Sequence, residues 1–334
     1  MKYSNRLGEI SNEQLQKALD KLKLGKFVKA EPIGFGNFGQ NLFLTSDKGE
    51  FVLRGKPHYP WQFPSEQFMA NLFHENTKVP VPWPYLVDGD MGIFGWSYCI
   101  MPRLQGLQLK DKAVYDQLPL KDKLEVAQAL GENLAEMQKL TWEFSGKYDL
   151  ESRTIKPLEK PWDQWVIDFI DDLVSKSATY SDKTPKKDVE WINQLIETGK
   201  EALQAPFTPT FVMHDYQISN MVVDKVNGKW QVTGLFDLME NYFGDGESDL
   251  SRVYVAYAEE NETLAYAFLN SYLSKMKVRQ GFEKRWPIYM ILDRIVVWEW
   301  AQRNGKCWWK QEYTFREWVE GNTLLDVKRL IIKK

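Results

Sequence analysis

The stretch FVMHDYQISNMVVDKVNGKWQVTGLFDLME, residues 211–240, decides the fold. It contains Asp215, then Asn220 five positions later, then Asp237 after a strand–turn–strand pattern. The apolar segments that flank these polar residues predict a β-hairpin, so the polar side chains fall on loops at strand ends. Loops held by a rigid scaffold are where catalytic side chains concentrate, and this stretch is therefore the first candidate for a functional site.

These three side chains have the chemistry that phosphoryl transfer requires. The reaction needs a carboxylate that orients an attacking hydroxyl group, and oxygen ligands that hold Mg²⁺ on the nucleotide phosphates. We therefore interpret Asp215 as the candidate catalytic base, and Asn220 and Asp237 as candidate metal ligands. A chance surface turn is the alternative for the D-x-x-x-x-N pattern alone, but the second aspartate at a suitable distance favours the functional interpretation.

A glycine-rich pattern near the N-terminus points to the same chemistry. Gly34, Gly36 and Gly39 form a G-x-G-x-x-G pattern between two predicted strands, residues 27–30 and 41–45. A dinucleotide-binding glycine loop would open a helix instead. Because a glycine loop between two strands is the kinase arrangement, we expect these glycines to cover the phosphates of a nucleotide.

Two charged residues follow the glycine pattern. Arg54 ends a predicted strand where a kinase-type site needs a cation for the α- and β-phosphates, and its planar fork can grip a phosphate with two hydrogen bonds. Glu66 falls in the first turn of a predicted helix. It either pairs with Arg54 or simply favours the helix dipole, and the sequence leaves both interpretations open.

At this point the chain resembles a known family. It is similar to the aminoglycoside phosphotransferases and the choline kinase-like enzymes, which have a protein-kinase-like fold. The resemblance runs from about residue 33 to residue 254. It is carried by residues 79–82, 95–101, 104–106, 130–138, 215–220, 244–245 and 249–250.

The resemblance implies an α+β, bilobal protein-kinase-like fold. Residues 1–104 would form a small N-lobe with an antiparallel sheet, and residues 105–334 a larger, mainly helical C-lobe. The hinge would lie at residues 101–104, where Met101 and Leu104 contact the adenine or guanine base. The implied cofactors are Mg²⁺ and ATP or GTP as co-substrate. Helices are predicted over residues 12–22, 120–139, 162–175, 189–203, 262–275 and 283–303.

Three residues depart from the family pattern. Met213 and Gln138 stand where the family usually has histidine, and Arg54 replaces the usual lysine. None of these changes removes the candidate base or either metal ligand, so an active enzyme is the better interpretation. A nucleotide-binding pseudokinase that acts as a sensor or scaffold is the alternative. A protein kinase is a weaker one, because no Ala-Pro-Glu segment follows Asp237.

The resemblance also implies that the C-terminal third shapes the acceptor pocket. Carboxylates at Asp245, Glu259, Glu260 and Asp293, together with a dense set of tryptophans, are the candidate substrate contacts. Solvated loops for the carboxylates and helix core for the tryptophans are the alternatives. Asp293 needs a partner if it is buried, for which Arg252, a water or a cationic acceptor are candidates, with Arg294 expected to point off another face.

We therefore expect a small-molecule kinase that transfers the γ-phosphate to a hydroxyl group. Its acceptor is expected to be an antibiotic of the aminoglycoside or macrolide type, on resemblance alone. A metabolite kinase of the choline kinase-like group is the alternative within this class.

The amino-acid composition excludes several other classes of protein. The chain has 334 residues, 43% of them hydrophobic and 27% charged, which indicates a globular protein of about two domains or lobes. A net charge of −3 argues against a nucleic-acid binder. Two cysteines make no disulfide framework, and no signal peptide, membrane span or zinc site is evident. We expect a cytoplasmic enzyme without a membrane partner, either monomer or dimer.

Overall fold

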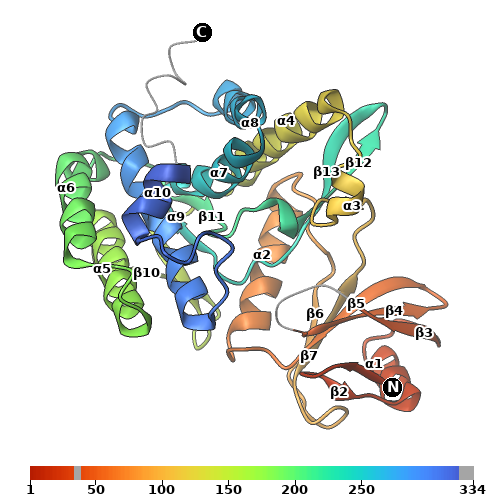
Figure 1. The fold of residues 1–334 in the computed structure, drawn as a ribbon. Helices are drawn as coiled ribbons and strands as arrows, with labels where there is room; N and C mark the ends of the chain where they lie inside the picture. The colour runs from red at the N-terminus through yellow and green to blue at the C-terminus, as the bar shows by residue number, and fades with distance from the viewer. Residues whose placement is uncertain (34–38, 323–334) are drawn as a thin grey trace.

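The computed structural model describes residues 1–33 and 39–322. Figure 1 shows a β-sheet at one end of the molecule, a group of helices at the other, and α2, Gln62–Asn76, between them. Gly34 and Gly36 lie outside the described residues, whereas Gly39 lies within them. The predicted α+β, bilobal architecture is confirmed.

The N-terminal sheet has five antiparallel strands in the order β3-β4-β5-β7-β6. Alternate residues of β4 are buried, and Leu42 and Leu44 pack with Leu15 and Leu19 of α1 in one apolar cluster. This period-two pattern puts one face of the strand into the core. The elements of this part are β1 Lys2–Ser4, β2 Gly8–Glu9, α1 Asn12–Lys21, β3 Phe27–Pro32, β4 Asn41–Ser46, β5 Gly49–Gly55, β6 Leu86–Asp88 and β7 Tyr98–Pro102.

Helix α2 begins at Gln62, four residues before Glu66. Glu66 therefore lies in the second turn and is buried, which does not fit the alternative in which it only favours the helix dipole. Met69, Ala70 and Phe73 are buried on the same helix and join the core of the C-terminal part. The helix thus holds a charged side chain against the inner face of the sheet.

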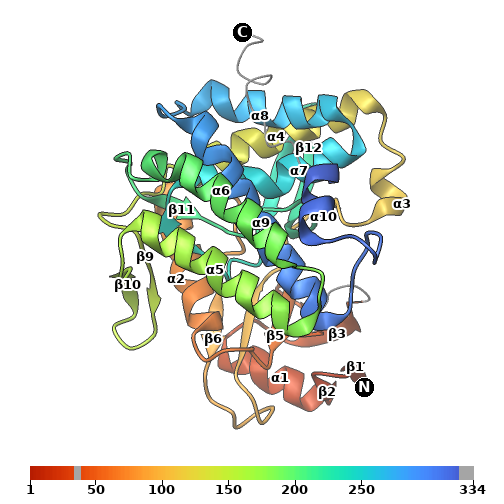
Figure 2. The same ribbon diagram turned by 60° about the vertical axis from the view of Figure 1, so that its left-hand side comes forward.

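The C-terminal part is mainly helical and contains two small antiparallel sheets, β13-β12-β8 and β10-β9-β14-β11. Helix α9 packs against α5 and α6, and α4 packs against α8 (Figure 2). The elements are β8 Leu107–Gln108, α3 Lys112–Tyr115, α4 Leu120–Met137, β9 Gly146–Asp149, β10 Thr154–Pro157, α5 Trp162–Tyr180, α6 Lys186–Leu203, β11 Thr210–Val212, η1 Ile218–Asn220, β12 Met221–Val226, β13 Lys229–Leu235, β14 Tyr242–Gly244, η2 Gly246–Asp249, α7 Leu250–Glu260, α8 Glu262–Lys275, α9 Phe282–Asn304 and α10 Phe315–Asn322.

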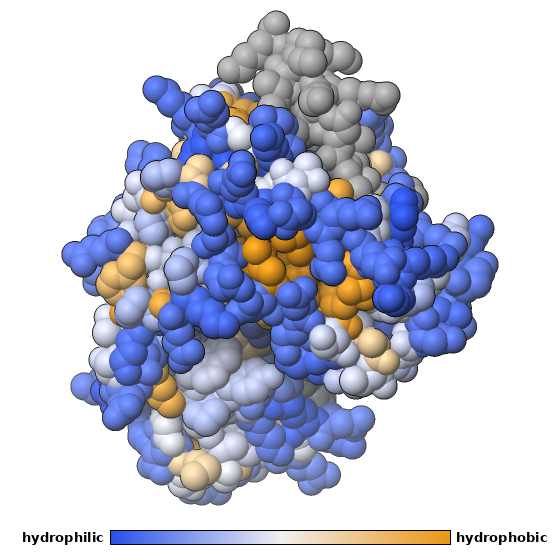
Figure 3. Space-filling view, turned by 90° about the vertical axis from the view of Figure 1, so that its left-hand side faces the viewer, coloured by the Kyte–Doolittle hydropathy of each residue, from blue (hydrophilic) through white to orange (hydrophobic). Residues whose placement is uncertain are grey.

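Hydrophilic side chains cover most of the face that α5 and α6 present, with hydrophobic patches near its middle (Figure 3). The tryptophans Trp286, Trp298 and Trp318 are fully buried instead. Packing in the helical core therefore accounts for these three rings, as the alternative to an acceptor contact holds. Within the described part of the chain, no helix combines the length and the apolar character that crossing a membrane would require.

Candidate active site

The loop that carries Asp215 lies between β11 and β12 and is held by a buried carboxylate. The backbone N–H groups of Met213 and His214 donate to Asp249 Oδ2 and Oδ1 at 2.6 and 2.8 Å. His214 has a φ of +64°, a conformation that a residue other than glycine adopts only when its surroundings enforce it. Asp249 therefore fixes the turn that presents Asp215, a role that sequence reasoning did not assign to it.

Asp215 is held on both carboxylate oxygens. Its Oδ1 accepts a hydrogen bond from Arg252 Nη1 at 2.7 Å. Its Oδ2 accepts from Asn220 Nδ2 at 2.9 Å and from Gln217 Nε2 at 2.7 Å. Burial raises the pKa of Asp215, and the Arg252 guanidinium opposes that rise. The predicted base and the predicted metal ligand Asn220 thus lie side by side.

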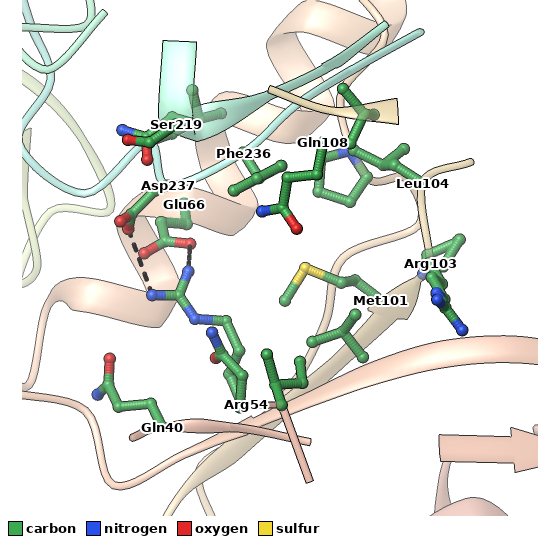
Figure 4. A pocket seen from close by; sticks show the side chains of 18 of the residues that line it. Gln40, Arg54, Glu66, Met101, Arg103, Leu104, Gln108, Ser219, Phe236 and Asp237 are labelled. Carbon is green, nitrogen blue, oxygen red and sulfur yellow. Dashed lines mark hydrogen bonds and ion pairs between the residues drawn. The ribbon is translucent and has the colours of Figure 1, made fainter. Parts of the chain in front are cut away.

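Arg54 connects the two lobes. Its Nη1 lies 2.7 Å from Glu66 Oε2, and its Nη2 lies 3.3 Å from Asp237 Oδ1, as Figure 4 shows. The predicted pairing of Arg54 with Glu66 is confirmed. Tyr85 Oη also donates to Glu66 Oε2 at 2.8 Å, so the carboxylate that positions Arg54 is itself positioned. The pKa of Glu66 is raised by burial, which the positive charge of Arg54 partly offsets.

A cavity of about 430 Å³ opens between the N-terminal sheet and the β12–β13 hairpin. One end is apolar, where Met101 and Leu104 face Phe236 (Figure 4). The other end is polar and lined by Arg54 and Asp237, with Gly39 and Gln40 at its edge. A flat purine ring would fit the apolar end of the cavity, and phosphate groups would fit the polar end. Asp215, Asn220 and Glu66 also line this cavity.

Residues 103–106 connect the N-terminal sheet to the C-terminal part and border the apolar end. Strand β7 ends at Pro102, and β8 pairs with β12 in the second sheet. Arg103 N–H donates to Glu50 O at 3.0 Å. Gly106 has a φ of +138°, and a Cβ there would lie 2.8 Å from Val223 O, so this close approach requires glycine.

The residues present fit a bound Mg²⁺. Asn220 directs its Nδ2 to Asp215, which leaves its amide oxygen as a candidate ligand, and Asp237 supplies a carboxylate. Oxygen ligands of this kind are the ones Mg²⁺ prefers, with one or two carboxylates and the substrate phosphates completing the shell. The described residues contain no group of three acidic, histidine or cysteine side chains that could hold a metal ion. A metal at this site would therefore need the nucleotide as well.

The two departures from family histidines are accommodated by packing and hydrogen bonds. Met213 is fully buried in the main apolar cluster beneath the loop. Gln138 donates from Nε2 to Gly246 O at 2.7 Å and accepts from Tyr272 Oη at 2.7 Å. It therefore ties the end of α4 to η2 and α8.

Asp245 is buried among cations and a hydroxyl group. Its Oδ2 accepts from Arg279 and, at 2.5 Å, from Tyr289 Oη, while its Oδ1 accepts from the backbone of Glu247 at 3.2 Å. Because both oxygens are used, these contacts favour a structural role for Asp245 over the predicted contact with the acceptor.

Asp293 is paired in a similar way. Its carboxylate accepts from Arg252 and from Arg294, the latter through Nε at 2.9 Å. The expectation that Arg294 points off another face is wrong, because its side chain folds back onto its neighbour. Burial raises the pKa of Asp293, but these two guanidinium groups outweigh it and hold that pKa below its usual value. A structural ion pair accounts for this carboxylate without an acceptor.

The remaining two predicted carboxylates lie at the end of α7. Glu260 Oε1 pairs with Lys123 at 2.7 Å and its Oε2 accepts from Tyr115 Oη at 3.1 Å, which joins α7 to α3 and α4. Glu259 is an exposed residue, although neighbouring atoms partly desolvate its carboxyl group and raise its pKa, which Arg294 opposes. Of the four predicted acceptor contacts, Glu259 alone has no hydrogen bond assigned to its side chain within the described part of the chain. Its contact with the acceptor stays a prediction.

A sheet lobe and a helical lobe that enclose a base-and-phosphate cavity, with Asp215 at its polar end, define a phosphotransferase of the protein-kinase-like fold. The phosphotransferase enzyme family model matches residues 29–285, and the chain belongs to that family. It is therefore a small-molecule kinase that uses a nucleotide and acts on a hydroxyl group. No curated protein matches the chain.

Solved structures show the same fold. One is a protein from Ralstonia eutropha JMP134 with a provisional assignment as an aminoglycoside phosphotransferase, at 14% identity and a TM-score of 0.65 over 91% of this chain and 93% of that one. A thermostable mutant of aminoglycoside phosphotransferase APH(4)-Ia with ADP and hygromycin B has 16% identity and a TM-score of 0.63 over 87% and 92%. The GDP and kanamycin complex of APH(2″)-IIIa has 13% identity and a TM-score of 0.62 over 93% and 96%.

Proposed function

We propose that this kinase transfers the γ-phosphate of ATP or GTP to a hydroxyl group of a small acceptor, with Asp215 as the base. The observation that carries the proposal is the meeting of Asp215, Asn220 and Asp237 with Arg54 at the polar end of one cavity. The nucleotide would lie between an N-lobe, residues 1–104, and a C-lobe, residues 105–334. Family complexes with ADP and with GDP support either purine nucleotide.

Arg54 would hold the α- and β-phosphates. Its guanidinium already has its position set by Glu66, so little conformational freedom is lost when a phosphate binds. Asp237, which lies next to Arg54, and Asn220 would hold Mg²⁺. When bound, the ion neutralises the charge that develops on the phosphates. Gly39 lies at the edge of the same cavity, where its backbone can approach a phosphate.

Asp215 would orient the attacking hydroxyl group and accept its proton late in the transfer. Asn220 and Gln217 fix one carboxylate oxygen and Arg252 fixes the other, so the carboxylate is aimed before the acceptor arrives. Such prior alignment is the main contribution that a protein makes to phosphoryl transfer. The contacts of Met213 and Gln138 provide the loop with packing and hydrogen bonds, which supports an active enzyme over a pseudokinase.

The identity of the acceptor is a separate part of the proposal. The complexes with hygromycin B and with kanamycin support an aminoglycoside acceptor as one candidate. A sugar or another hydroxylated metabolite is the second candidate, and the side chains beside Asp215 favour it, as argued below.

The test is transfer of labelled phosphate from ATP and from GTP to a panel of aminoglycosides, macrolides, choline and sugars. We expect transfer to at least one acceptor, dependent on Mg²⁺ and abolished in Asp215→Asn. Binding of nucleotide without transfer to any acceptor, and without slow nucleotide hydrolysis, would instead identify a pseudokinase.

A further inference from the structure

Four aromatic rings form a closed group directly beside the catalytic loop. Trp165 and Phe169 of α5 lie 5.3 Å apart between ring centroids, and Phe169 lies 5.7 Å from His214. His214 lies 5.4 Å from Tyr242 of β14, which in turn lies 5.1 Å from Trp165. We refer to these four residues as the aromatic box. Trp165 and Phe169 are only partly buried, so a ligand can reach them.

Lys147 of β9 places its ammonium over this box. Its Nζ lies 4.9 Å from the ring centroid of Trp165, 5.7 Å from that of Tyr242 and 5.8 Å from that of Phe169. Lys147 is an exposed residue, and the rings around its ammonium partly desolvate it, which lowers its pKa against the opposing charge of Glu240. Within residues 1–33 and 39–322, Lys147 makes no salt bridge. An accessible ammonium that lies over aromatic rings and has no carboxylate partner can donate hydrogen bonds to a ligand.

The aromatic box lies next to the Asp215 loop and outside the nucleotide cavity. His214 directly precedes Asp215 in the loop, and none of the four rings lines the nucleotide cavity. Desolvation raises the pKa of Glu240, Lys147 opposes this rise, and Asp237 and Asp215 add to it. Buried His214 has a pKa lowered to about 3 and is neutral, which leaves Lys147 as the cation of the box.

Several carboxylates of this region are paired with arginines. Asp293 is paired with Arg252 and Arg294, and Asp215 shares Arg252. The more remote Asp245 and Glu247 are paired with Arg279 and Arg285. Glu240, Asp249 and Glu259 make no salt bridge within the described part of the chain. An acceptor that carries several ammonium groups would be repelled by Lys147, which has no carboxylate partner in the described residues.

Building on the proposed function, we propose that Lys147 and the aromatic box bind an oxygen-rich, uncharged or anionic carbohydrate as the acceptor. The ammonium donates up to three hydrogen bonds to hydroxyl, carboxylate or phosphate oxygens. The partly exposed faces of Trp165 and Phe169 contact the apolar face of the sugar ring, as aromatic side chains do in small-molecule sites. Lys147 here is a binding residue for the acceptor and takes no part in the proton transfer.

The test is direct binding by calorimetry in the presence of a non-hydrolysable ATP analogue. The probes are glucose, glucuronate and glucose 6-phosphate on one side, and kanamycin on the other. The variants are Lys147→Met, which keeps the alkyl chain but removes the charge, and Lys156→Met as a matched control. Lys156 faces Lys147 in the β9–β10 hairpin and pairs with Asp149 at 2.9 Å. Lys147→Arg checks for rescue, and a melting curve confirms that each variant is folded.

We expect the wild type to bind at least one of the three sugars more tightly than kanamycin. Lys147→Met should weaken the binding of an anionic sugar by about tenfold or more, because one charge-assisted hydrogen bond is lost. It should weaken the binding of glucose less and leave the affinity for the nucleotide unchanged. Lys156→Met should bind each sugar with the affinity of the wild type. Tightest binding of kanamycin, absence of sugar binding, or equal behaviour of the two methionine variants would overturn the inference.

Failure of this inference is distinguishable from failure of the proposed function. Phosphate transfer to kanamycin alone would support the proposed kinase activity and overturn the proposed carbohydrate site. Sugar binding that depends on Lys147, without phosphate transfer from either nucleotide, would support the proposed carbohydrate site and overturn the proposed kinase activity.

Discussion

Arg252 joins Asp215 to a second buried carboxylate. Its Nη1 lies 2.7 Å from Asp215 Oδ1, and its Nε donates to Asp293 on α9. The candidate base is therefore connected through one guanidinium to the helix that forms the centre of the C-terminal core. A change at Asp293 can reach Asp215 without any contact with the acceptor.

The first prediction concerns Asp293→Asn. Breaking one partner of a buried ion pair costs about 3–5 kcal/mol, and here it leaves Arg294 and part of Arg252 uncompensated. We expect a much lower melting temperature and a lower kcat, with an acceptor KM close to that of the wild type. Thermal unfolding and steady-state kinetics check this. An unchanged melting temperature with a raised acceptor KM would show that Asp293 contacts the acceptor after all.

The second prediction concerns Asp215→Asn. The amide keeps the size of the carboxylate but cannot accept a proton, so turnover should fall by about 10²–10⁴-fold. Nucleotide affinity should remain, because the cavity wall is otherwise unchanged. Single-turnover kinetics and nucleotide titration measure both. Turnover close to that of the wild type would mean that another group is the base.

The sequence predicts most of the fold because its helices and strands follow local patterns. The helix predicted over residues 262–275 has the same bounds as α8, and the predicted Arg54–Glu66 pair forms at 2.7 Å. Period-two burial in β4 is an equally local signal. The loop with Asp215 and Asn220 was also found, since the spacing of its polar residues between apolar strands is visible in the chain itself.

The rest depends on contacts between distant segments. Asp249 lies 36 residues from Met213, and the chain carries no local sign that its carboxylate caps that loop. Consecutive residues on a helix usually point in different directions, so the sequence predicts that Arg294 points away from Asp293. The long side chain of Arg294 instead turns back and donates to Asp293. The aromatic box combines α5, β14 and a loop, so the pattern of any one of them does not reveal it.

The third prediction concerns pH and Asp249. Burial raises the pKa of Asp249 to about 7, so the folded protein keeps a proton that the unfolded chain loses near pH 4. The free energy of unfolding therefore falls as pH rises from about 4 to about 7, and is flat beyond. Asp249→Asn has no such titration. We expect the stability of the wild type relative to this variant to decrease over that range, measured by urea unfolding. Parallel profiles would show that Asp249 is ionised throughout.

The fourth prediction concerns the metal ligands. Asp237→Ala removes the carboxylate oxygen that Mg²⁺ prefers, so nucleotide binding should no longer tighten when Mg²⁺ is added. Asn220→Ala should show a milder loss, because a neutral amide contributes less charge at the metal. Asn220→Ala also removes the 2.9 Å hydrogen bond that Asn220 donates to Asp215. The turnover of this variant should therefore be reduced more strongly than the Mg²⁺ dependence of its nucleotide binding.

The measurement is a nucleotide titration with and without Mg²⁺ for each variant. Asp224→Ala is the matched control, because Asp224 is an exposed carboxylate on the same hairpin and outside the cavity. Since Asp237 also pairs with Arg54 at 3.3 Å, its removal frees that guanidinium for phosphate. Binding without Mg²⁺ should therefore be kept or become tighter in Asp237→Ala. A full Mg²⁺ effect in this variant would place the metal elsewhere, and weaker binding in both conditions would mean that Asp237 acts through the fold.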